Sequence, residues 1–411
     1  MTDSDLEEGS SLGKNKSFRS DFNSPHRNAV VGGYWAKSKD YTVCDGFMQA
    51  TLALLAVAEA GGYTPTNDDC GYVSIDALVY PICFNARHFI ELFLKDAIHA
   101  ISGLNKKRPS DKVKATHELT ELWDTFVSTM ERDSRLLAFG MPLKEVFMEF
   151  AEVDNTSMTF RYPSDLDGKA HLSDLVHINI EVLGTRLRKV FNYADEFTRY
   201  LKVLQHEYEQ NSYTNKLNRG NIEDIARRLP VYDKWSEDLI YVKEQLCSEF
   251  HLSSNDFGKV LELIKHNREF SILIGIELPL EGLPVDVFSR LASIHANEGV
   301  YDLITKDEWL RLDAIMAIGY SSHYSEEYDL ILKEYSALGL NDYCIEDIVR
   351  KAFEDDQILR CGLLTLGQHK LLAALAKALP QLSEPLAEMP ETEYSTYLKN
   401  AYFKMMRPNP F

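Results

Sequence analysis

The chain has 411 residues, of which 45% are hydrophobic and 26% are charged, and 63 Asp and Glu against 44 Lys and Arg give a formal net charge of −19. This length predicts two or three domains with well-formed cores, and the ordinary apolar content excludes global disorder. The acidic excess argues against a protein that coats itself in basic surface to hold DNA non-specifically, although a small basic cleft remains compatible with it.

The cysteines and the N-terminus indicate a cytoplasmic protein. Six Cys are scattered without a CxxC pair, which predicts reduced thiols rather than disulfides or a zinc site. The first residues are acidic and then rich in Ser and Asn, without the apolar segment of a secretory signal. The most apolar stretch, Phe47–Ala60, is too short for a bilayer and contains Gln49 and Glu59, so we expect no membrane association.

The N-terminal half begins with a predicted disordered tail, residues 1–28, whose polar composition cannot offset the entropy of ordering. Beyond the tail, apolar residues recur every three or four positions, which is typical of amphipathic helices. We expect residues 29–212 to form one all-helical domain. Its predicted helices are Phe47–Ala60, Ser74–Ile101, His117–Arg132, Lys144–Val153 and Asp174–Gln210, with a loop at Phe160–Gly168.

A polar, Asn-rich segment, Asn211–Asn221, marks the predicted domain boundary. Helical periodicity returns after it, so residues 213–411 are predicted to form a second all-helical domain, and the fold class is all-α. Within it, Leu252–Ile274 has the pattern of a helix-turn-helix, but its acidic flanks argue against sequence-specific DNA binding. The predicted helices are Ile222–Arg228, Trp235–Phe250, Ser254–His266, Pro284–His295, Lys306–Ala317, Glu326–Leu338, Ile345–Phe353 and Leu364–Ala378.

Several common catalytic and cofactor motifs are missing from the sequence. It contains no GxGxxG after a predicted strand, no GxxxxGK[ST] loop, no HExxH and no GxSxG. His171 and His177 lie beside Asp174, but no pair of carboxylates stands at helical spacing to complete a metal site. We therefore expect neither a metal nor a cofactor.

One polar stripe interrupts the otherwise apolar second helix. Arg87, His88, Glu91, Lys95 and His99 fall within about a third of the helix circumference at roughly 100° per residue. Charges on a mostly buried helix are costly unless they are paired. The stripe is therefore either an ion ladder that joins positions i, i+4 and i+8, or a polar cleft in which the two cations hold phosphate and a histidine moves a proton.

Three ordered blocks carry a resemblance to a known family. They are YPICFNARHFIELFLKDAI (Tyr80–Ile98), HELTELW (His117–Trp123) and FRYPSD (Phe160–Asp165). Over roughly Gly33–Gln210 the chain resembles bacterial helical-bundle proteins of the HEPN-like superfamily, in which these blocks often read YPxxFxxRHxxELxLK, HxLxxLW and FRYPxD. The resemblance does not extend to the C-terminal half.

The resemblance implies an antiparallel helical bundle, often dimeric, in a protein of anti-phage defence or of a toxin system. Many HEPN relatives are metal-independent ribonucleases, in which an Arg stabilises the charged phosphorane and a His four to six residues away transfers the proton. This sequence departs from that spacing after Arg87, where Leu92, Phe93 and Leu94 stand instead of a second histidine. Of the similar pairs elsewhere, Arg199 and His206 alone lie inside the matched region and on one helix face.

A second arrangement uses the matched blocks themselves. His117 opens a predicted helix, where free N–H groups favour an anion, and Arg161 lies in the FRYP loop. These two residues could converge with the stripe as a phosphate or nucleotide pocket, or could equally tie the loop and the helix start onto Glu91. The candidate catalytic residues are therefore Arg87, His88, Glu91, His117, Arg199 and His206, and the candidate phosphate-binding residues are Lys95 and Arg161.

These observations predict a HEPN-like protein that acts on or binds RNA, by metal-independent phosphodiester cleavage if it is an enzyme. Two alternatives stay open. One is a non-catalytic interaction or sensor module that docks a protein partner or a second copy of itself, which the missing Arg–His spacing and the acidic charge favour. The other is a nucleotide-binding switch.

Overall fold

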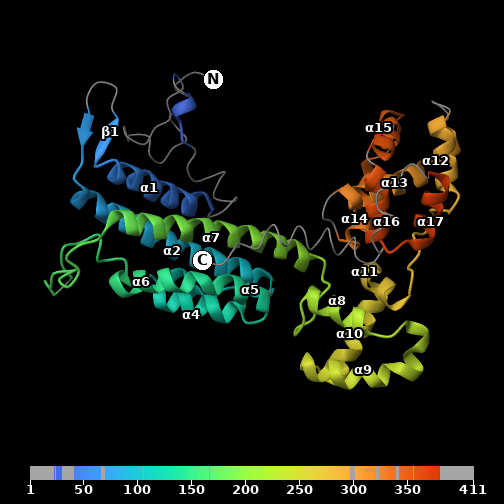
Figure 1. Ribbon diagram of the computed structural model, residues 1–411, viewed down its shortest axis with the longest axis horizontal. Helices are drawn as coiled ribbons and strands as arrows, with labels where there is room; N and C mark the ends of the chain where they lie inside the picture. The colour runs from blue at the N-terminus through green and yellow to red at the C-terminus, as the bar shows by residue number, and fades with distance from the viewer. Residues whose placement is uncertain are drawn as a thin grey trace, which may run out of the picture. The chain divides into compact units, whose positions relative to one another are not determined.

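The computed structural model describes residues 23, 25–29, 41–65, 70–104, 106–165, 167–296, 301–320, 324–338, 342–354 and 356–379. Helices dominate these ranges (Figure 1), which confirms the all-α class. Their β structure is limited to a short antiparallel pair, β1 (Tyr63–Pro65) and β2 (Cys70–Tyr72), and an isolated bridge. Most of the predicted N-terminal tail, residues 1–28, lies outside the described residues.

The chain divides into two compact units, Met1–Asp96 and Ala97–Phe411, and the boundary expected near residue 212 stays a prediction. The first unit holds α1 (Tyr41–Glu59), the strand pair and most of α2 (Ile75–Leu104). Its two helices meet where the Cys44 thiol on α1 donates to the Phe89 carbonyl of α2 at 3.9 Å. None of the helices in the described ranges has the length and apolar content that a bilayer span requires.

The second unit begins with a group of helices whose core is aromatic. Phe126 packs edge-to-face on Phe197 with ring centroids 5.5 Å apart, and Phe139 contacts both Phe197 and Tyr200. Such ring pairs add stabilisation beyond the area that they bury. The helices are α3 (Asp111–Ala115), α4 (Leu119–Met130), α5 (Ser134–Gly140), α6 (Lys144–Asp154) and the long α7 (Ile180–Glu209).

A smaller group of helices follows α7 around its own apolar core. Ile222, Phe257, Val260 and Phe270 are buried together in this core. Ser253 and Asp256 form a reciprocal capping box at the start of α10 (Ser254–His266). The group consists of α8 (Arg219–Arg228), α9 (Trp235–Glu249), α10 (Ser254–His266) and α11 (Arg268–Ser271).

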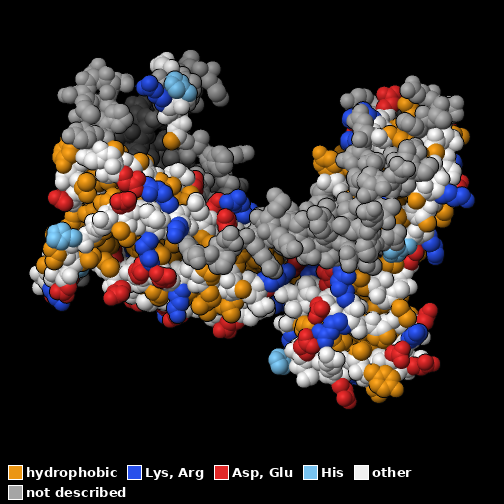
Figure 2. All heavy atoms as spheres, viewed as in Figure 1, with side chains coloured by type: hydrophobic (Ala, Val, Ile, Leu, Met, Phe, Trp, Pro, Cys, Tyr) orange, Lys and Arg blue, Asp and Glu red, His pale blue; other side chains and the backbone are white. Residues whose placement is uncertain are grey.

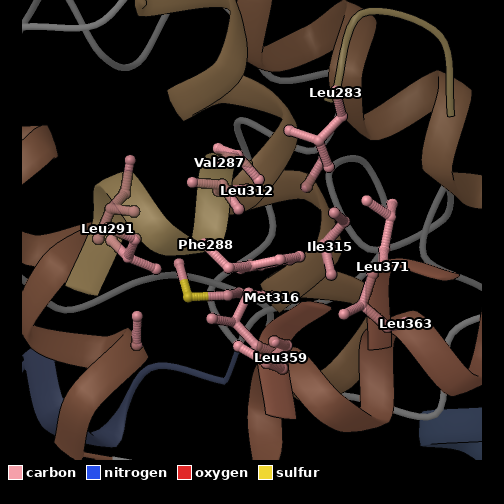
Figure 3. Packing of buried hydrophobic residues seen from close by; sticks show 14 of the residues in the cluster. Leu283, Val287, Phe288, Leu291, Leu312, Ile315, Met316, Leu359, Leu363 and Leu371 are labelled. Carbon is pink, nitrogen blue, oxygen red and sulfur yellow. The ribbon is translucent and has the colours of Figure 1, made fainter. Parts of the chain in front are cut away.

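The last group is built around an apolar cluster in which Phe288, Ile315, Met316 and Leu363 interdigitate (Figure 3). Two of its helices, α13 (Lys306–Tyr320) and α16 (Asp356–Thr365), approach one another closely at a glycine. An added Cβ at Gly319 would stand 1.9 Å from the Ile358 carbonyl oxygen, so only glycine permits this approach. The group consists of α12 (Val287–Ala296), α13 (Lys306–Tyr320), α14 (Glu327–Leu338), α15 (Asp342–Glu354), α16 (Asp356–Thr365) and α17 (His369–Ala378).

The structure corrects two predicted helix boundaries. The long helix begins at Ile180 rather than Asp174, because the Asn179 side chain accepts a hydrogen bond from the Val182 N–H and caps it there. The single helix predicted over Leu364–Ala378 is instead the end of α16 and all of α17. Gly367 separates them with a left-handed φ of +64°, a conformation that terminates helices.

Candidate functional site

The polar stripe on α2 forms a ladder of ion pairs. The Arg87 guanidinium donates to the Glu91 carboxylate one turn further on, and Lys95 Nζ donates to Glu91 Oε1 at 2.8 Å. Arg87 is 0% exposed and Glu91 is 2% exposed, whereas Lys95 is partly exposed. The residues thus occur at the spacing of the predicted ladder, but the first two members lie in the protein interior rather than at its solvent edge.

This burial decides what Arg87 is able to touch. A guanidinium binds phosphate by directing its fork of N–H donors at the oxygens, which requires an open approach. Here the guanidinium has no solvent-exposed area and donates to a carboxylate on its own helix. In this conformation, Arg87 therefore neutralises Glu91 and offers nothing to a polyanion.

His88 lies beside the ladder and is partly exposed. Its ring meets Phe47 edge-on at 4.4 Å and stacks on Phe84 at 5.9 Å, so α1 and α2 both hold it. Its Nδ1 lies 4.0 Å from the nearer Glu91 oxygen, beyond hydrogen-bond range. The imidazole is positioned by aromatic packing.

Arg199 and His206 on α7 pair with different carboxylates. Arg199 Nη2 contacts Asp195 Oδ2 at 2.7 Å in an exposed i, i+4 pair, which is the ordinary arrangement on a solvated helix face. The His206 imidazole instead contacts Glu327 in the first turn of α14. His206 is therefore one of the contacts that connect the bundle helices to the last helical group.

The remaining candidates lie on exposed loops. His117 is exposed just before α4 begins at Leu119. Arg161 is exposed in the FRYP loop and stacks over the neighbouring Tyr162 ring at 5.5 Å. Lys95 belongs to the first unit and these two residues belong to the second, so their convergence into one pocket stays a prediction.

Sequence reasoning missed the most concentrated set of charges in the second unit, which we call the polar junction. It contains two arginines, Arg135 and Arg219, each held by two carboxylates; Asp133 is a near neighbour of Arg135 in the chain, whereas the other three carboxylates come from distant segments. Arg135 Nη2 lies 2.7 Å from Asp133 Oδ2 and 2.7 Å from Glu207 Oε1. Its other members are Tyr208, Ser212, Asn218, Asn267, Glu269 and Glu326.

The second arginine of the junction is the more deeply enclosed. Arg219 is 4% exposed and contacts Glu269 Oε2 at 2.9 Å and Glu326 Oε1 at 2.5 Å. Its guanidinium also packs against the rings of Phe270 and Tyr324, at 4.8 and 4.6 Å from their centroids. One side chain at the start of α8 therefore connects α11 to the chain entering α14.

In the polar junction, the cost of burying charge is offset by ion pairs and hydrogen bonds. Burial acts to raise the pKa of Asp133, but the hydrogen bonds and the charge of Arg135 outweigh it and hold that pKa below its usual value. Burial raises the pKa of Tyr208, and the charge of Asp133 adds to this effect. Each arginine of the junction lies between two carboxylates, so the charges of these residues compensate one another.

No local signal in the sequence reveals this junction. Arg219 and Glu326 are 107 positions apart, and Arg135 and Glu207 are 72 apart. The structure shows that Asn218 forms a capping box with Asn221 and that Asn267 caps α11. The side chains of these caps then continue into the junction.

Within the described ranges, no group of three or more His, Cys, Asp or Glu is arranged to hold a metal ion. His171 lies in the irregular segment before α7 and His177 near its start, as loop residues. Comparisons with known proteins supply no further guide, because no family model, no curated protein and no solved structure matches the chain.

Proposed function

We propose that the protein is a helical interaction module that docks a protein partner and does not cleave RNA. The burial of the Arg87–Glu91 pair supports this most directly. Metal-independent cleavage requires a cation that reaches the phosphate and a base beside it. The guanidinium that the HEPN-like pattern would use is that of Arg87, and in the protein interior it is paired with the Glu91 carboxylate.

The other candidate pairs support the same proposal. Arg199 is paired with Asp195 on an exposed helix face and the His206 imidazole contacts Glu327, so both side chains have acidic partners within the chain. The net charge of −19 disfavours a polyanionic substrate and favours a basic partner. The HEPN-like resemblance of the N-terminal half would then reflect a shared helical scaffold. This scaffold would bind a partner protein or a second copy of the chain.

RNA binding without cleavage is a second candidate, and one observation favours it. Arg161 and Tyr162 are both exposed and stacked on one another in the FRYP loop, and an exposed ring next to a guanidinium is a typical platform for an unpaired base. The nearby Asp165 and Asp167 oppose such binding by repelling phosphate.

A cleavage assay tests the proposal. The full-length protein is incubated with labelled tRNA and mRNA in EDTA, beside the His88→Ala variant and a matched control, His266→Ala, which removes an exposed histidine from α10. We expect intact RNA in all three samples. Cleavage by the wild type and by His266→Ala that disappears in a folded His88→Ala variant would refute the proposal.

The ladder itself makes a second prediction. Glu91→Gln leaves Arg87 as a buried charge without its carboxylate, so the melting temperature should fall by several degrees. The exposed pair gives the control, because Asp195→Asn removes a carboxylate from Arg199 at the surface and should change the melting temperature little. Equal and small shifts of the melting temperature in both variants would show that the ladder does not stabilise the fold.

A further inference from the structure

The helix α9 packs on the core of its group through a narrow face. Leu246 is its one buried side chain, while Leu239 and Val242 are partly buried against the core that α8 and α10 share. Trp235 fixes the start of the helix, since its indole N–H donates to the Pro230 carbonyl at 2.9 Å. These contacts account for how α9 is held.

The opposite face of α9 carries apolar side chains that these contacts do not explain. Ile240 is 67% exposed and Tyr241 is 78% exposed, and Tyr232 is also exposed just before the helix. A β-branched isoleucine is a poorer helix former than the polar residues usual at such positions, so it gains nothing for the fold there. Exposed apolar side chains gathered on one helix face commonly mark a binding surface.

Acidic residues surround this apolar pair. Glu237 and Glu244 are exposed one turn before and one turn after it, so the outer face follows the spacing i, i+3, i+4 and i+7. Asp233 and Asp238 add negative charge nearby, against Lys234 and Lys243. Figure 2 shows hydrophobic and acidic side chains next to one another on the surface over this helix.

We propose that the outer face of α9 docks a basic amphipathic helix of a partner protein. Apolar side chains of that helix would cover Ile240 and Tyr241, and Lys or Arg one turn away would pair with Glu237 and Glu244. This inference rests on the proposed function and names the class of partner. An RNA would meet like charge here, and so would the α9 face of a second copy of the chain.

A binding measurement with a defined probe tests the inference. The probe is a fluorescent helical peptide, KLLKKLLKKLLKKL, and its analogue with every Lys replaced by Glu gives the charge control. Anisotropy of the full-length protein should detect binding of the basic peptide and none of the acidic one. Glu237→Gln combined with Glu244→Gln should weaken that binding and reduce its dependence on salt.

A matched pair of variants locates the binding. Ile240→Ala with Tyr241→Ala should weaken it at least about tenfold, because central apolar anchors dominate such interfaces. Tyr320→Ala with Leu330→Ala is the control, since these side chains are 79% and 57% exposed on α13 and α14, and should leave binding unchanged.

Two outcomes overturn the inference: equal binding by the α9 variant and the wild type, or a dimer in sedimentation that dissociates when the α9 face is changed. Neither outcome touches the proposed absence of RNA cleavage. Conversely, cleavage that depends on His88 would refute the proposed function while leaving peptide binding at α9 to be judged by its own variants.

Discussion

Removal of the Arg219 guanidinium provides a strong test of the polar junction. Arg219→Met keeps an unbranched side chain of similar length but leaves the carboxylates of Glu269 and Glu326 next to one another without their shared cation. Breaking a buried ion pair from one side costs about 3–5 kcal/mol. The packing against Phe270 and Tyr324 is partly preserved by the methionine.

The assay is urea denaturation followed by circular dichroism and tryptophan fluorescence. We expect Arg219→Met to lose about 3–5 kcal/mol, and the triple variant that adds Glu269→Gln and Glu326→Gln to recover much of it, because no unpaired carboxylate then remains. The control is Arg227→Met on the same helix, whose guanidinium forms an exposed pair with Glu223 and should matter by no more than about 0.5 kcal/mol. A loss below about 1 kcal/mol for Arg219→Met, or a triple variant no more stable than the single one, would refute this reasoning.

Two further predictions concern the last helical group. Gly319→Ala should destabilise the protein by about 1–3 kcal/mol or more, because its Cβ would overlap the Ile358 carbonyl. The control is Gly258→Ala on α10, where an added Cβ has no neighbour within 4 Å. In the same urea titration this control should be neutral or slightly stabilising. Asp313 has a raised pKa, chiefly because burial disfavours its charge and despite the attraction of Lys351, so its ionisation destabilises the fold as the pH rises through the folded pKa. Asp313→Asn should therefore be more stable than the wild type at pH 7, and the difference should shrink on acidification below the carboxyl's raised pKa; a gain that persists unchanged at low pH would contradict this.

The sequence was most informative where local chemistry determines structure. The predicted helix Ser254–His266 is α10, because its apolar spacing and its capping box both lie within one short segment. The predicted start of the long helix was wrong, because Asn179 caps the helix at a position that apolar periodicity alone does not reveal. Gly367 ended a helix that its leucine pattern would have continued.

The candidate site divides in the same way. The spacing of Arg87, Glu91 and Lys95 on one helix gave their pairing as one of two interpretations, because neighbours four apart meet on a helix surface. The depth at which Arg87 lies depends on tertiary packing and was not readable. The junction around Arg219 was hidden altogether, since Glu326 reaches it from more than a hundred residues away.

Chemical accessibility of Arg87 tests the central claim most directly. Phenylglyoxal modifies guanidinium groups that solvent reaches, and Arg161 in the exposed FRYP loop gives an internal reference in the same sample. With the folded protein and peptide mass mapping, we predict modification of Arg161 and none of Arg87, which should react only after unfolding in urea. Modification of Arg87 in the folded protein at a rate near that of Arg161 would contradict the burial of Arg87. It would then favour a phosphate-binding role for this side chain.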